Sequence, residues 1–229
     1  PFADGSDMMG SLRTPSSFCR TYSFRPTPGI IPCKINHSEN LPQISTNGAI
    51  ARHPIDLALL IEILSGKTTQ LLPLKTPNVK KLQNKIFGIP SDYLSNIIFE
   101  EGIIELFNSY VDKLRNVGAK VVELDFNFDK AILWNSWTIL RSKVISSNLK
   151  EEYNHQKVLL KDTIIWEIER GIKITNEDLN QAKKMQSFAY DKLNKLFQEI
   201  DFLMLPSAQV FPFSIKYPYP VSINGHEMD

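Results

Sequence analysis

The stretch from Lys85 to Phe126 constrains the fold of this 229-residue chain more than any other. It opens with a short apolar run, KIFGIP (85–90), and closes with a second one, AKVVELDF (119–126), and both have the character of buried strands. Between them, residues 99–118 predict an amphipathic helix whose apolar face consists of Ile103, Phe107, Tyr110, Val111 and Leu114. Strand, helix and strand in about forty residues form a βαβ unit with parallel strands and a right-handed crossover. The predicted fold class is therefore α/β.

The second half of the chain is predominantly helical by pattern. Helices are expected over residues 129–150, 161–171 and 177–200, and the last carries an apolar stripe of Ala182, Met185, Ala189, Leu193, Leu196 and Ile200. A buried strand, DFLMLPSA, and a loop rich in proline and tyrosine come after these helices. We therefore expect three parts: an α/β core over 1–126, a helical section over 127–200, and a return to the core over 201–229.

The N-terminal part contains two expected loops. Residues 4–11 are small and predict a loop, after which a helix can begin because Pro15 is tolerated in a first helical turn. TYSFRPT (21–27) predicts a short strand. Residues 26–48, rich in proline, asparagine and serine, predict a long surface loop.

One strong helix is predicted at residues 53–66. Pro54 occupies its first position and Gly66 stands just past its end, which is the usual asymmetry of helix termini. Its apolar core, IDLALLIEIL, contains two acidic residues and is far shorter than the roughly 20 residues that span a bilayer. No membrane association is therefore expected.

The charge balance and the cysteines limit the classes of partner and compartment. With 26 basic and 25 acidic residues the net charge is +1, which gives no electrostatic reason to expect nucleic acid as a partner. Cys19 and Cys33 are too few for a disulfide framework, and no secretory signal is visible. A reducing compartment, the cytoplasm, is the expected location.

The segment DGSDMMGSLRTP (4–15) is the main candidate for chemistry. A serine hydroxyl needs a nearby base to become a nucleophile, and a tetrahedral oxyanion needs backbone N–H donors such as a turn of small residues supplies. Residues 8–11 could supply those donors beside Ser11, with Asp7 and Arg13 bracing the turn. The alternative is an ordinary loop in which Ser11 caps the following helix.

Other common motifs are missing from the sequence. There is no G-x-S-x-G elbow, no Walker P-loop and no G-x-G-x-x-G. The four histidines have no metal-ligand spacing with one another or with cysteine. The sequence therefore offers no motif for a metal or a nucleotide.

The first 32 residues resemble the signature of a known family. GSDMMGSLRTPSSF and FRPTPGIIP are similar to the central signature of the amidase signature family of serine hydrolases, and the two methionines resemble the branch of 6-aminohexanoate cyclic-dimer hydrolase. The stretches NGAIARHPIDLALLIEILSG, DFLMLPSAQVFPF and INGHEM are similar to later parts of the same family. The resemblance covers essentially the whole chain.

The resemblance implies a fold and a reaction. The fold would be a mixed central sheet covered by helices, with residues 127–200 over the substrate pocket. Ser11 would match the acylated nucleophile of a Ser–cis-Ser–Lys triad, and the backbone N–H groups of Met8, Met9, Gly10 and Ser11 would match the oxyanion hole. Asp7 and Arg13 match positions that brace the turn. The reaction would be hydrolysis of a small-molecule amide through an acyl-enzyme, without a metal or cofactor, and the resemblance leaves a homo-oligomer open.

The sequence also departs from the family pattern. The family's lysine and bridging serine lie upstream of the signature, and Ser6 is too close to Ser11 to be that bridge. We therefore expect a fold incomplete at both ends and a chain that is not catalytic alone. Arg20 and Ser23 stand where glycines are usual. Two alternatives remain: a non-catalytic remnant or scaffold, and the A subunit of a glutamyl-tRNA amidotransferase.

Overall fold

The computed structural model describes residues 1–32, 41–66 and 79–228. They belong to two compact units. The first contains residues 1–32, 46–127 and 196–229, and the second contains residues 33–45 and 128–195. No helix among the described residues is both long and apolar enough to cross a membrane. Cys33 and His37 lie outside the described residues.

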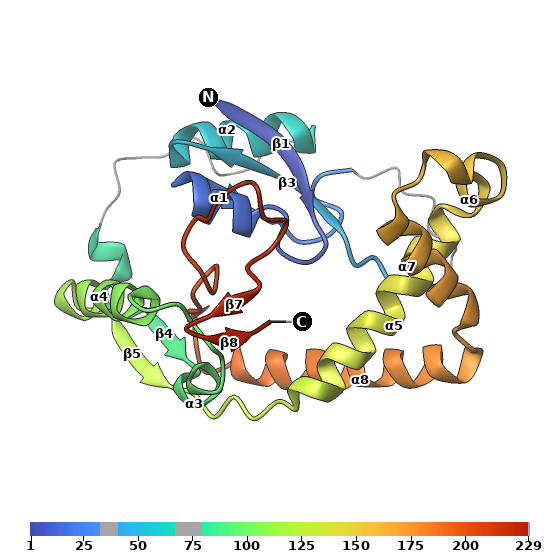
Figure 1. The fold of residues 1–229 in the computed structure, drawn as a ribbon. Coiled ribbons are helices and arrows are strands. Elements are labelled where there is room, and N and C mark those ends of the chain that lie inside the picture. The colour runs from blue at the N-terminus through green and yellow to red at the C-terminus, as the bar shows by residue number, and fades with distance from the viewer. Residues whose placement is uncertain (33–40, 67–78, 229) are drawn as a thin grey trace. The chain divides into compact units, whose positions relative to one another are not determined.

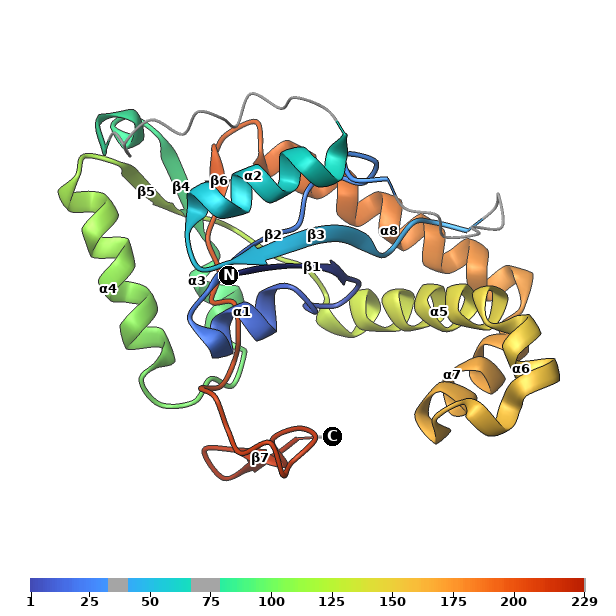
Figure 2. The ribbon, with the colours of Figure 1, turned by 90° about the horizontal axis from the view of Figure 1, so that it is seen from above.

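The first unit contains a three-stranded antiparallel sheet with the strand order β1-β3-β2 (Figures 1 and 2). The strands are β1 (Phe2–Asp7), β2 (Tyr22–Phe24) and β3 (Thr46–Ala51). The strand predicted over 21–27 is confirmed in its central residues. The loops predicted over 4–11 and 26–48 are wrong where β1 and β3 pair, with Gly5 opposite Gly48. Pairing between distant segments here outweighs the low strand propensity of small residues.

The two faces of this sheet are covered by different elements, because successive residues of β3 point to opposite sides. On one face Ala49 packs in a buried cluster with Leu60 and Ile61 of helix α2 (Pro54–Ser65). On the other face, a Cβ placed on Gly48 would collide with Leu12 and with the carbonyl oxygen of Phe24. Leu12, which is fully buried, therefore lies directly against the sheet.

Helix α2 begins and ends as its sequence predicts, and α1 begins with Pro15 in its first turn as expected. In α2, Pro54 is in the first turn and Gly66 ends the helix in a left-handed conformation, φ 62°. Helix α1 (Arg13–Cys19) holds Pro15 in its first turn. Its end residue Arg20 also has a left-handed backbone, φ 51° and ψ 47°, a conformation that glycine adopts with less strain.

The βαβ unit is confirmed. Strands β4 (Ile86–Ile89) and β5 (Lys120–Glu123) pair in parallel, and α4 (Ile103–Asn116) connects them. The short helices η1 (Val79–Leu82) and α3 (Ser91–Ser95) flank β4 in the sequence. Val111 is buried as expected, but Tyr110 is 54% exposed, which corrects its assignment to the apolar face. Lys113 lies over the Tyr110 ring instead, 4.3 Å from its centroid.

The last strand of the parallel sheet is shorter than expected. Strand β6 (Phe202–Leu203) pairs in parallel with β4 and gives the strand order β5-β4-β6. Phe202 is 46% exposed, so the prediction of a buried strand over 201–208 is wrong in both length and burial. Only the two residues of this segment that lie opposite β4 form a strand. The predicted loop over 209–229 contains a small hairpin of β7 (Ser222–Ile223) and β8 (His226–Glu227).

The second unit is helical in its described residues. It contains α5 (Lys130–Asn148), α6 (Lys150–Gln156), η2 (Lys157–Leu159), α7 (Asp162–Lys173) and nearly all of α8 (Asn176–Leu196). Helices α5 and α7 approach closely at Gly171, where a Cβ would meet the carbonyl oxygen of Ser142. The Ser142 hydroxyl donates to the buried carboxylate of Glu167.

The contact between β3 and the residues after β1 gives a first prediction. Replacing Gly48 with alanine places a methyl group against Leu12 and the Phe24 carbonyl, and we expect it to destabilise the fold by about 1–3 kcal/mol. Urea unfolding followed by circular dichroism measures the change. Ser6→Ala, at an exposed position of the neighbouring strand β1, is the matched control and should change stability by under about 0.5 kcal/mol. Equal stability of Gly48→Ala and the control would contradict the packing described here.

Candidate functional site

The candidate site begins at Asp7, the last residue of β1. Its side chain is fully buried, although carboxylates are rarely buried without partners. The backbone N–H of Gly10 donates to Oδ1 at 2.6 Å, and that of Leu12 donates to Oδ2 at 3.3 Å. Gly10 has φ 109°, a backbone conformation that favours glycine. The chain therefore folds back over its own carboxylate between β1 and α1.

Arg13 closes the turn from the helix side. Its Nε donates to Asp7 Oδ2 at 2.9 Å and its Nη2 donates to Oδ1 at 3.0 Å, which is the two-pronged geometry that suits a carboxylate. Burial by itself raises the pKa of Asp7. The hydrogen bonds from Arg13, Gly10 and Leu12 outweigh that effect and hold the pKa well below its usual range. Asp7 is therefore a structural anion that stays ionised, and the predicted bracing pair is present.

A second arginine, absent from the sequence-based prediction, also reaches this turn. The Nε of Arg25 donates to the backbone carbonyl oxygen of Asp7 at 3.2 Å and lies 3.9 Å from Oδ1. The available signal was a basic residue directly before Pro26, at the end of the predicted strand. Arg13 and Arg25 therefore hold the side chain and the main chain of the same aspartate.

The structure separates the two interpretations of Ser11. Helix α1 begins at Arg13, its N-cap residue is Leu12, and no side chain caps it. Ser11 is therefore not the helix cap, and that alternative is wrong. The residue is exposed, and its hydroxyl makes no hydrogen bond with any of the described residues.

The four expected oxyanion donors are not equivalent in this structure. The N–H of Gly10 already donates to Asp7. Within the described part of the chain, the N–H groups of Met8, Met9 and Ser11 have no hydrogen-bond acceptor. Three N–H groups of this turn, including that of Ser11 itself, are therefore unpaired among the described residues.

A cavity of about 740 Å³ lies beside this turn. One wall comes from Met9 at the turn and from Thr14 and Phe18 of α1. The other comes from the segments after β4 and β6, residues 93–99 and 205–210. The chain leaves β4 toward β5 and returns to the opposite side of β4 as β6. The cavity therefore lies at the carboxyl ends of parallel strands where the strand order switches, the usual ligand position in α/β sheets.

The C-terminal segment lines the cavity and is fastened to the loop before α4. Gln209 accepts from the N–H of Glu100 at 2.8 Å through its backbone carbonyl, and its side chain donates to the carbonyl of Ile98 at 3.0 Å. Asn224, in the β7–β8 turn, donates to the Phe99 carbonyl at 2.8 Å. The rings of Phe18 and Phe213 meet edge to face with centroids 5.6 Å apart. These contacts join the C-terminal segment to both walls.

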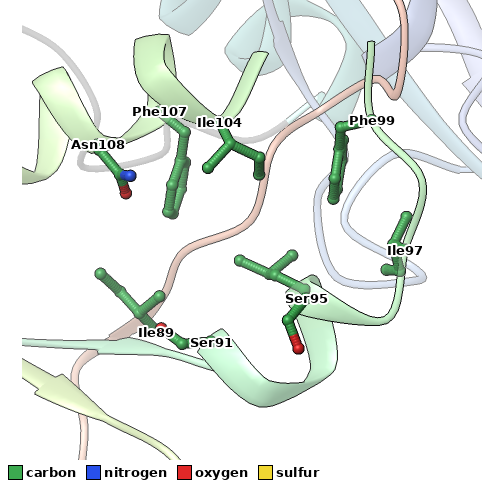
Figure 3. Close-up of a pocket in the computed structure, with 9 residues that line it drawn as sticks. Ile89, Ser91, Ser95, Ile97, Phe99, Ile104, Phe107 and Asn108 are labelled. Carbon is green, nitrogen blue, oxygen red and sulfur yellow. The ribbon is translucent and has the colours of Figure 1, made fainter. Parts of the chain in front are cut away.

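A second cavity, of about 430 Å³, adjoins the first behind Leu94, Ile97 and Phe99, which line both. Figure 3 shows Ile104 and Phe107 pointing into it from α4, opposite Ile89 at the end of β4. No group of three or more metal-ligating side chains occurs among residues 1–32, 41–66 and 79–228. The described site is therefore a turn with a serine beside two apolar cavities.

Comparison with known proteins identifies the family of this arrangement. A family model described as Amidase matches residues 1–228. The A subunit of the glutamyl-tRNA(Gln) amidotransferase of Legionella pneumophila (strain Corby) is 29% identical over 158 residues, which make up 65% of this chain and 32% of that protein.

Two solved structures share the fold. A bacterial aryl acylamidase of the amidase signature family matches with a TM-score of 0.78 and 19% identity, over 100% of this chain and 51% of that chain. A 6-aminohexanoate cyclic dimer hydrolase, complexed with its substrate, matches with a TM-score of 0.69 and 15% identity, over 87% and 45%. The chain thus spans about half the length of these solved chains. The α/β class and the amidase signature fold are confirmed.

The buried carboxylate gives a second prediction. In Asp7→Asn the amide keeps one oxygen for Gly10, but its NH₂ group faces the donors of Leu12 and Arg13. We expect a loss of about 1.5–3 kcal/mol of stability at pH 7, the range for hydrogen bonds to charged groups. Urea unfolding measures the loss. Asp4→Asn, at an exposed position of the same strand, is the matched control and should be nearly neutral.

The same pair of variants has a defined pH dependence. The pKa of Asp7 is lower in the folded chain than its ordinary value. Its stabilising contribution is therefore complete above about pH 4 and is lost progressively as the pH falls below that. The stability difference between wild type and Asp7→Asn should shrink over that acidic range. A difference that stays constant down to about pH 2 would contradict the ionised state of Asp7.

Proposed function

The chain belongs to the amidase family, and from that membership we propose that it supplies the nucleophile of an enzyme that hydrolyses carboxamides. Ser11 is the proposed nucleophile. One observation carries the proposal: Ser11 is exposed beside three unpaired backbone N–H groups, on a turn fixed by the buried Asp7 carboxylate. A nucleophile surrounded by donors in a fixed geometry is what acyl transfer requires.

The proposed reaction has two halves. Ser11 Oγ loses its proton to a base and attacks the amide carbonyl, whose oxygen becomes an oxyanion held by the N–H groups of Met8, Met9 and Ser11. The carbon–nitrogen bond then breaks, and the nitrogen takes a proton and leaves as ammonia or an amine. Water next attacks the ester on Ser11 and releases the carboxylic acid, which regenerates the serine. The Gly10 N–H contributes indirectly because it holds Asp7 below the turn.

The base is the part of the proposal that lies outside this chain. No described residue is hydrogen-bonded to the Ser11 hydroxyl, and the chain spans about half of the solved relatives. We propose that a lysine acting through a second serine, as the family resemblance implies, is supplied by polypeptide beyond these 229 residues. Arg13 is not a candidate, because its guanidinium stays protonated and is engaged by Asp7.

The proposal extends to partners and location. The substrate would be a small-molecule amide and not a nucleic acid. A cytoplasmic location would suit the unpaired Cys19. Assembly with further copies or chains is compatible with the proposed reaction. The main competing function is that of the amidotransferase A subunit, which the Legionella relative favours. A non-catalytic scaffold is the remaining alternative. The lining of the cavity bears on the amidotransferase function, and labelling of Ser11 tests the scaffold alternative.

Covalent labelling in the organism that makes the protein tests the nucleophile. A fluorophosphonate probe should tag the peptide that contains Ser11, because the probe reacts with activated serines. The tag should disappear in Ser11→Ala and persist in Ser6→Ala, a neighbouring serine on β1 that serves as the matched control. Mass spectrometry of the tagged peptide identifies the site. The mass of the intact tagged species shows whether Ser11 acts within a longer chain.

Two outcomes of this labelling would decide against the proposal. Loss of the tag in Ser6→Ala but not in Ser11→Ala would show that Ser11 is not the nucleophile. An untagged protein, under conditions where other serine hydrolases of the same extract are tagged, would favour the non-catalytic scaffold.

A further inference from the structure

The large cavity, which Met9 of the turn lines and Ser11 does not, has no charged side chain among its described lining residues. All the described residues that line it are uncharged at neutral pH, and five are aromatic: Phe18, Tyr93, Phe99, Phe213 and Tyr219. Its volume of about 740 Å³ falls within the usual range for small-molecule sites. The few polar side chains are neutral hydroxyls and one amide. The lining therefore favours an apolar ligand group and offers no counter-charge to an ionised one.

Three charged groups near the cavity, Asp7, Arg13 and Glu100, are engaged elsewhere. Asp7 and Arg13 bind each other within the turn. The carboxylate of Glu100, at the edge of the C-terminal segment, accepts the backbone N–H of Phe211 at 2.7 Å. Among the described residues, neither a carboxylate nor a guanidinium lines the cavity. A ligand carboxylate or ammonium that entered it would lose water without gaining an ion pair, which is costly.

The apolar character continues beyond the first cavity. The adjoining space in Figure 3 is lined by isoleucine, leucine and phenylalanine side chains with two serines and one asparagine. The shared wall of Leu94, Ile97 and Phe99 is apolar on both sides. The described residues around both cavities therefore carry no charge.

From these observations we propose that the site selects neutral amides bearing an aromatic or similarly bulky apolar group, and that it excludes amides carrying an ammonium or carboxylate, such as free glutamine. This inference rests on the proposed function for its identification of the amide, but the cavity itself binds the apolar group whether or not Ser11 reacts. It disfavours the amidotransferase alternative, since an aminoacyl substrate carries an ammonium group.

Binding to the unreactive protein tests the proposal separately from catalysis. Isothermal titration calorimetry compares acetanilide, a neutral aromatic amide, with L-glutamine, using the Ser11→Ala variant of the protein as its source makes it. We expect acetanilide to bind at least about tenfold more tightly, because burying the charges of glutamine has no compensation. Tighter binding of glutamine would overturn the proposal.

Substitutions at two lining residues test whether the ligand binds in this cavity. Val210→Glu introduces a carboxylate into the lining and should weaken acetanilide binding at least about tenfold, whereas the matched Val210→Leu should retain it. Ala208→Phe fills the cavity without a charge and should also weaken binding, so the test does not depend on whether Val210→Glu folds. Unchanged binding in Ala208→Phe would overturn the assignment to this cavity.

The two proposals fail in different ways. If the fluorophosphonate tags Ser11 but acetanilide does not bind to Ser11→Ala, the selectivity is wrong and the hydrolase proposal stands. If acetanilide binds as expected but Ser11 is never tagged, the cavity is a ligand site and the proposed catalysis is wrong.

Discussion

The burial of one ionised carboxylate is the constraint on which the rest of this site depends. Asp7 is removed from water, and its burial is possible only because two backbone N–H groups and the guanidinium of Arg13 satisfy its oxygens. Those donors all lie within six residues of Asp7, so the carboxylate organises the turn that directly follows it. Leu12, pressed against Gly48 on the sheet, anchors the same turn from its apolar side. Polar and apolar contacts together fix the backbone around Ser11.

The cavity next to that turn has a different origin, because its walls are distant in sequence. Residues 9–18 supply one wall, and residues 205–228 supply much of the other. Contacts of such separation carry a larger loop-closure entropy than contacts within the turn. The hydrogen bonds that Gly10, Leu12 and Arg13 make to Asp7 are local in sequence, whereas the cavity needs the C-terminal segment to be fastened to the Phe99–Glu100 loop.

This division explains what could be predicted from the sequence. The βαβ unit, α2 and the long helices arise from periodicity and from end signals such as Pro54 and Gly66, which act within one element. Strands β1 and β3 consist of small residues and exist because they pair with each other, so no local pattern marks them. Asn224–Gly225, by contrast, is a local hairpin signal that the sequence did carry, and both residues have positive φ. The Asp7–Arg13 pair was predicted, whereas the basic residue before Pro26 did not by itself show that Arg25 reaches Asp7, because that contact depends on where β2 ends beside the turn.

A buried anion so near Ser11, the proposed nucleophile, could oppose the proposed reaction. The other charges at the turn explain why Asp7 does not. An isolated carboxylate behind the three N–H groups would repel a developing oxyanion. Here the Nε of Arg13 lies 2.9 Å from Asp7 Oδ2 and the Nε of Arg25 lies 3.9 Å from Oδ1, so two cations lie next to one anion. The carboxylate can then shape the turn through its hydrogen bonds while the two guanidinium groups offset its charge. A turn built on a neutral side chain would avoid the repulsion, but it would lack the strong charge-assisted bonds that hold the donors in place.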